Sequence, residues 1–193
     1  MLRGLYDWTM RMAAHRRAMG WLFAVAFVES SVFPIAPDVM IVPMVLAEKA
    51  KALRIALVCT LGSVLGALAG YAIGALLFEA VGRPLIAFYG YAEPFAEFTA
   101  RYNEWGAWIV AFAALTPFPF KVITIASGAT GLDLAVFIVS ATLARGLRFG
   151  LEAALLWRFG PSIRGFIEGN LRLVTSVFFC LLIGGFVMIK YLV

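Results

Sequence analysis

The sequence of 193 residues is poor in charge and contains one histidine and two cysteines. Charged side chains make up 14% of the chain and apolar ones 63%, and the mean hydropathy is +0.95. This composition excludes an ordinary soluble domain and predicts an all-α integral membrane protein. A Ser/Gly/Pro-rich linker is also missing from the sequence, so we expect a single membrane domain over residues 1–193.

The scarcity of reactive side chains excludes several kinds of site. Cys59 and Cys180 lie inside apolar runs and His15 lies in a basic cluster, so we expect no metal site and no cofactor. Neither His-Glu-x-x-His nor Gly-x-Ser-x-Gly occurs, so we expect that the protein is not an enzyme. The net charge of +5 comes from short basic clusters beside apolar runs, which fits cytoplasmic loops and anionic lipid headgroups and predicts no nucleic-acid partner.

What the chain does contain is apolar runs interrupted by proline and charge. The run 19–47 is broken by two carboxylates and three prolines, which are Glu29, Asp38, Pro34, Pro37 and Pro43. Proline removes a backbone donor and clashes with the preceding helical turn, so we predict a break near residues 33–37. Basic clusters flank both ends of the run, which places both ends in the cytoplasm. We therefore predict a re-entrant hairpin with Pro34 and Pro37 at its tip, and a kinked span is the alternative.

Two flanking segments complete the first half of the chain. Residues 1–18 carry four arginines against one acid and predict an amphipathic helix on the cytoplasmic surface, with a cytoplasmic N-terminus. The 24 uncharged residues between Arg54 and Glu79, at about 1.5 Å each, suffice to cross a hydrocarbon core of about 30 Å. Glycine recurs there every four residues and predicts a helix-packing seam, formed by Gly62, Gly66, Gly70 and Gly74.

The second half repeats this pattern. An acidic and aromatic loop, 79–104, is expected along the outer surface. After a short apolar run, Pro117 and Pro119 precede Lys121 and predict a second break with these prolines at the hairpin tip. A turn-rich exit whose only charge is acidic, 127–133, then predicts a return to the outer face.

The run 134–157 is long enough to cross the membrane again. It carries Arg145, Arg148 and Glu152 at i, i+3 and i+7, so the three lie on one helical face, which should turn inward because lipid-facing charge is costly. A last uncharged run, 173–189, predicts a C-terminal transmembrane helix. The predicted order is a hairpin, a span, an outer loop, a hairpin that faces the opposite side, and a second span. This order predicts an inverted repeat, as in transporters whose broken helices meet at a site near the membrane midplane.

These residues carry a resemblance. The pattern Glu-x4-Pro-x2-Pro-Asp, the glycine-rich span, and Pro-Phe-Pro-Phe-Lys followed by Ser-Gly and an arginine-bearing helix resemble the DedA family, whose conserved region is the VTT domain, and most closely its YqaA-like branch. The resemblance covers about residues 18–158. It implies a multi-pass protein of the bacterial inner membrane, of the lipid flippase and scramblase class, which moves undecaprenyl phosphate or phospholipid and uses protons as a coupling partner.

The resemblance also assigns functional positions. It carries the family's acidic pair to Glu29 and Asp38, and a basic position to Lys121, where the family usually has arginine. A further basic residue that the family has before the proline of its second hairpin is absent here. Arg145 or Arg148 would have to supply that charge for binding an anionic headgroup.

The residues themselves fit such a role. Glu29 lies about 15 Å inside its run, where a carboxyl group can exchange a proton during transport, and an arginine can bind phosphate through two parallel hydrogen bonds. The alternative is that the charges only hold the hairpins, with Glu29 or Asp38 paired to Lys121 and with Arg148 paired to Glu152. A proton-coupled small-ion or solute antiporter and a non-catalytic assembly factor stay open as functions, and so does a homo-oligomer.

Overall fold

The computed structural model describes residues 17–32, 36–116 and 118–169, and within them every regular element is helical. The elements, in chain order, are α2 (Ala18–Ser31), α3 (Asp38–Ala47), the short 3₁₀-helix η1 (Lys49–Lys51), α4 (Ala52–Leu77), the π-helix η2 (Phe78–Gly82), α5 (Arg83–Phe88), α6 (Ala92–Glu104), α7 (Gly106–Leu115), α8 (Phe120–Ala129) and α9 (Leu134–Gly169). The predicted helices over residues 1–16 and 173–189 lie outside the described residues, as do Pro34 and Pro117.

Both predicted breaks are present. The first run ends its helix at Ser31 and resumes at Asp38, and the second ends at Leu115 and resumes at Phe120. Thr116 is extended at the second break, as expected for a residue before proline. One of the interrupting prolines of the first run does not interrupt the helix. Pro43 lies buried inside α3, which continues past it to Ala47.

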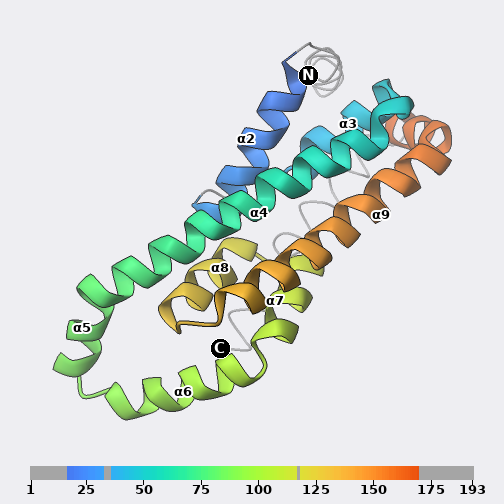
Figure 1. The fold of residues 1–193 in the computed structure, drawn as a ribbon. Helices are drawn as coiled ribbons and strands as arrows, with labels where there is room; N and C mark the ends of the chain where they lie inside the picture. The colour runs from blue at the N-terminus through green and yellow to red at the C-terminus, as the bar shows by residue number, and fades with distance from the viewer. Residues whose placement is uncertain (1–16, 33–35, 117, 170–193) are drawn as a thin grey trace.

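Helix α4 is the centre of the molecule and packs against α2, α8 and α9, as Figure 1 shows. Its glycine stripe makes this possible, because a Cβ on Gly62 would lie 2.6 Å from the carbonyl oxygen of Phe23 in α2. A Cβ on Gly66 would also meet the α2 backbone, whereas one on Gly70 or Gly74 would meet α8. One face of α4 thus receives both interrupted segments at backbone distance.

The segment after α4 is helical, although the sequence predicted a loop over 79–104. Helix α4 passes through the π-turn η2 into α5, and the chain reverses at Gly90, which has a φ of +73° that glycine adopts readily. Helix α6 follows at the end of the molecule opposite the start of α2 (Figure 1). Its exposed Glu97 and Arg101 form an ion pair of 2.6 Å, which suits a helix lying on a membrane surface.

Helix α9 is longer than predicted. It begins at Leu134, as the sequence indicated, but continues past residue 157 to Gly169. Arg158 and Arg164, which follow the predicted span, therefore lie within the helix. Helices α7 and α3 pack against α9, so that both interrupted segments contact α4 and α9.

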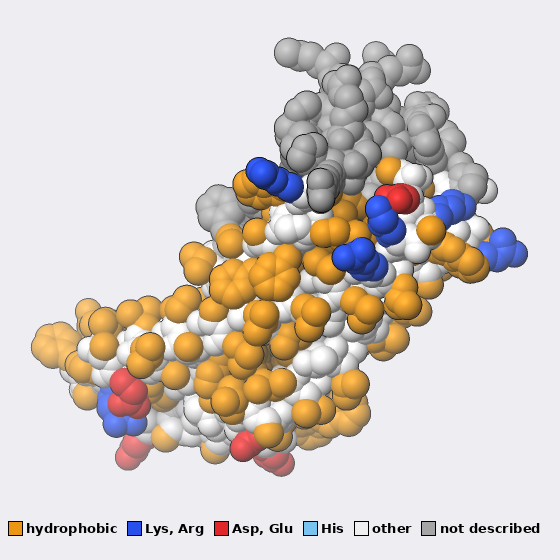
Figure 2. Space-filling model, turned by 45° about the horizontal axis from the view of Figure 1, so that its top comes forward, with side chains coloured by type: hydrophobic (Ala, Val, Ile, Leu, Met, Phe, Trp, Pro, Cys, Tyr) orange, Lys and Arg blue, Asp and Glu red, His pale blue; other side chains and the backbone are white. Residues whose placement is uncertain are grey.

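In the part of the chain that the structure describes, two helical stretches are long and apolar enough to cross a membrane, Lys49–Phe88 and Leu134–Gly160. Their outer faces expose leucines four residues apart, such as Leu57 and Leu61 on α4 and Leu143 and Leu147 on α9. Figure 2 shows apolar side chains across the middle of the visible face and charged ones gathered toward its two ends. This distribution is that of a membrane protein, with apolar side chains toward lipid and charges toward water.

Candidate functional site

The two breaks meet beside the charged face of α9. Arg145, which is 0% exposed, donates from Nη2 to Oε2 of Glu29 at 2.8 Å. Glu29 lies in the last turn of α2 and its side chain is 14% exposed. The ion pair therefore joins the first interrupted segment to α9 in a setting with little access to water, where removing one partner is costly.

Small hydroxyl side chains surround this pair. Ser30 Oγ donates to Glu29 Oε2 at 2.9 Å and shares a 2.7 Å hydrogen bond with the hydroxyl of Ser63 on α4. Thr124 of α8 donates to the backbone carbonyl of Ser30 at 3.0 Å. All three hydroxyl residues are fully buried, so the carboxylate of Glu29 belongs to a network that links α2, α4 and α8.

The guanidinium of Arg145 stacks on an aromatic ring. Its Cζ atom lies 4.1 Å from the ring centroid of Phe120, which is fully buried at the start of α8, a distance typical of a cation–π contact. Nε and Nη1 of Arg145 are buried and have no hydrogen-bond partner among the described residues. A buried guanidinium with two free donors is costly to maintain, and these donors could bind an oxyanion.

A second ion pair lies about one turn further along α9. Nη2 of Arg148 donates to both carboxylate oxygens of Asp38, at 3.1 and 3.2 Å, and Nη1 donates to the carbonyl of Thr116 at 3.3 Å. Asp38 begins α3 and Thr116 ends α7. Arg148 thus contacts the breaks of both segments at once.

The spacing of Arg148 and Glu152 predicted an i,i+4 ion pair, and the structure pairs Arg148 with Asp38 instead. Glu152 lies about one turn further along α9 and is half-buried. Arg148 pairs with Asp38 because the packing of α3 on α9 brings the carboxylate of Asp38 within reach of the guanidinium.

The sequence left open a pairing of Lys121 with Glu29 or Asp38, but the structure gives Lys121 a different partner. Its Nζ donates to the carbonyl of Val32 at 3.3 Å, just after α2 ends, while Arg145 and Arg148 take the two carboxylates. Lys121 therefore bridges the breaks of the two segments. The described tip prolines, Pro37 and Pro119, occupy the position before the first helical residue of α3 and α8 respectively.

The sequence analysis identified the charged residues but missed the neutral side chains that hydrogen-bond to them or pack on them. Ser30, Ser63, Thr124 and Phe120 lie in apolar runs, where nothing in their spacing distinguishes them from packing residues. The serine next to Glu29 was the one available signal, since a hydroxyl beside a buried carboxylate can donate to it. Within residues 17–32, 36–116 and 118–169, no three His, Cys, Asp or Glu side chains are grouped to hold a metal ion.

The chain is similar to other proteins over most of its length. The VTT domain matches residues 33–158. An uncharacterized protein of Haemophilus influenzae is 35% identical over 168 residues, which cover 85% of this chain and 87% of that protein. An uncharacterized protein of Histophilus somni is 34% identical over 168 residues, with coverage of 85% and 87%. No solved structure matches the chain.

Proposed function

The chain belongs to the VTT-domain family, the DedA family of membrane proteins, and from this premise we propose that it is a lipid transporter of the flippase or scramblase class. Its cargo is an anionic lipid such as undecaprenyl phosphate or a phospholipid, and protons drive the movement. The observation that carries the proposal is the meeting of both interrupted segments at Arg145 and Arg148. Charges at membrane depth mark a pathway more often than an anchor.

The proposed architecture is an inverted repeat in the inner membrane of a bacterium. Segments α2–α3 and α7–α8 are its two re-entrant hairpins, each followed by a long apolar helix, α4 or α9. In such repeats the broken helices supply the binding site near the bilayer midplane. The basic residues around η1 and the acidic residues of α6 lie toward opposite ends of the chain's apolar helices, which supports a cytoplasmic N-terminus.

The coupling step is an exchange of partners at Arg145. Protonation of Glu29 removes the negative charge to which Arg145 is bound, and the guanidinium, which already has two free donors, then takes up the phosphate of the lipid. Deprotonation of Glu29 restores the ion pair and releases the phosphate.

The test is transport in vesicles that contain the purified protein. Fluorescent phospholipid and labelled undecaprenyl phosphate are followed separately, with and without a pH gradient. Glu29→Gln should fold and lose transport, because the amide keeps the shape and hydrogen-bonding capacity of the side chain but cannot exchange a proton. Movement of neither lipid by the native protein, together with proton flux that depends on a small solute, would favour the antiporter. Movement of neither without such flux would favour an assembly factor.

A double-mutant cycle separates transport from structural support. Glu29→Gln and Arg145→Gln should each cost about 3–5 kcal/mol of stability, because each leaves its buried partner without a counter-charge. If Glu29 and Arg145 only hold the fold, the double variant should recover stability and transport together. If they carry transport, the double variant recovers stability and stays inactive. Thermal unfolding and lipid movement are measured on the same preparations.

A further inference from the structure

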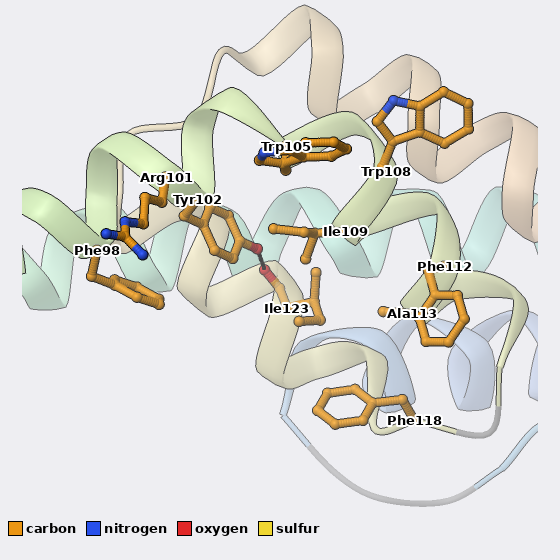
Figure 3. Close-up of a pocket in the computed structure, with 10 residues that line it drawn as sticks. All are labelled: Phe98, Arg101, Tyr102, Trp105, Trp108, Ile109, Phe112, Ala113, Phe118 and Ile123. Atoms are coloured by element: carbon orange, nitrogen blue, oxygen red, sulfur yellow. Dashed lines mark hydrogen bonds between the residues drawn. The ribbon is translucent and has the colours of Figure 1, made fainter. Parts of the chain in front are cut away.

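A groove separate from the charged site lies between α6, α7 and α8 (Figure 3). Its volume is about 620 Å³, which falls within the usual range for small-ligand sites of about 300–1,000 Å³. Ten residues line it, namely Phe98, Arg101, Tyr102, Trp105, Trp108, Ile109, Phe112, Ala113, Phe118 and Ile123.

The lining is apolar except at one end. Arg101 is the one charged residue of the ten, and it lies with Phe98 at the α6 end of the groove (Figure 3). The hydroxyl of Tyr102 is bonded to Ser127 at 3.0 Å, so it does not offer a free polar group to a ligand. Such a lining favours a ligand that is a long hydrocarbon with a negative charge at one end.

The groove opens on the outer surface of the molecule. On α7 its lining extends from Trp108 to Ala113, which is about 8 Å of helix. Trp108 and Phe112 at its rim are 72% and 71% exposed, so the groove opens toward the apolar surroundings of the protein. Arg101 lies exposed on α6 and is paired with Glu97 at 2.6 Å, so a lipid phosphate at this position would share the guanidinium with that carboxylate.

We propose that this groove holds one hydrocarbon chain of a bilayer phospholipid, with the phosphate at Arg101 and the chain directed toward Phe118. Phe118 lies in the break between α7 and α8, two residues after Thr116, whose carbonyl Arg148 binds. The far end of the groove therefore adjoins the charged site. The inference that the bound lipid is later transported rests on the proposed function, whereas its binding in the groove does not.

Photolabelling of the native protein tests the binding directly. The protein is reconstituted in vesicles containing phosphatidylglycerol with a diazirine in the middle of one acyl chain, and labelled residues are mapped by mass spectrometry. Labels should concentrate at Trp108, Phe112 and Ile123. Leu143 on α9, which is 69% exposed to the same surroundings, is the reference for random lipid contact. Labelling of the groove no stronger than that of Leu143 would overturn the proposal.

Two variants sharpen the result. Ile109→Trp fills the groove and should lose the labels at Phe112 and Ile123, whereas Leu143→Trp adds the same bulk to an exposed position and should keep them. Arg101→Gln should weaken labelling by phosphatidylglycerol more than labelling by a diazirine diacylglycerol, which lacks the phosphate. An equal loss with both probes would contradict the role given to Arg101. Strong groove labelling without lipid movement by the native protein would leave this site standing and refute the proposed transport.

Discussion

At the scale of single residues, the site is a set of charges held by neutral neighbours. Arg145 is fixed by one carboxylate, one serine and one aromatic ring, and its remaining donors have no partner among the described residues. Burial of unpaired polar groups is destabilising, so proteins retain such an arrangement where the unpaired donors serve a function. The neighbours therefore deserve tests as much as the charges.

The first residue to test is Ser30. Ser30→Ala removes hydrogen bonds to Glu29 and Ser63 and leaves the buried hydroxyl of Ser63 without this partner, so unfolding should become easier by about 1–3 kcal/mol. Ser30→Ala with Ser63→Ala should cost less than the sum of the single changes, because they share one bond. Thermal unfolding in detergent measures both, and Ser140→Ala on α9 is the matched control. Additive costs would show that the two hydroxyls do not cooperate.

The second is Lys121, whose Nζ reaches the carbonyl of Val32 across the two breaks. Lys121→Arg should retain lipid transport, because charge and donor are kept, and Lys121→Met should lose binding of the anionic headgroup. Vesicle transport at two lipid concentrations distinguishes weak binding from slow movement. Normal transport by Lys121→Met would limit Lys121 to a structural role.

At the scale of elements, one face of α4 decides how the interrupted segments are held. The segments are short, with α3, α7 and α8 each ten residues long, and isolated helices of that length are marginal. Their stability therefore comes from packing, which the glycines of α4 allow by bringing backbones together. The stripe is thus a structural requirement of both segments.

Two alanine substitutions test this with the same chemical change. A Cβ at Gly66 would clash with the backbone of Phe27, whereas one at Gly150 on α9 would meet nothing within 4 Å. Gly66→Ala should destabilise by about 1–3 kcal/mol, and Gly150→Ala should be neutral or stabilise by up to about 1 kcal/mol, as alanine favours helix. Yield of folded protein and thermal unfolding are the measurements. Equal behaviour of the two variants would refute close packing at the stripe.

At the scale of the whole molecule, charge is distributed between two ends. Arg17, Lys49 and Arg54 lie where α2 and α4 begin, and the acidic side chains Glu93, Glu97 and Glu104 lie on α6. By the positive-inside rule the first end faces the cytoplasm. The orientation follows from charge alone and stays a prediction.

Matched cysteines test the orientation. In a background with Cys59→Ala and Cys180→Ala, Ala50→Cys lies at the basic end and Ala92→Cys at the start of α6, and both alanines are exposed. A membrane-impermeant thiol reagent should label Ala50→Cys only from the cytoplasmic side and Ala92→Cys only from the other. Labelling of both positions from one side would exclude the inverted repeat.

The sequence by itself determined the class, the long apolar helices and the position of both breaks. Each of these depends on local properties, because hydropathy over about 20 residues predicts a span and proline acts on the turn in which it stands. The segment 79–104 differs from the prediction of a loop, since this aromatic segment forms helices of its own.

Only the tertiary structure decided which charges meet. Glu29 and Arg145 are 116 positions apart and Asp38 and Arg148 are 110 apart, so no local spacing relates them. The sequence offered the pair of Arg148 and Glu152 as an alternative, because i,i+4 neighbours lie close on a helix. Packing of α2 and α3 against α4 and α9 placed other carboxylates within reach of the arginines. Ion pairing depends on distance in space, which the order of residues along the chain does not specify.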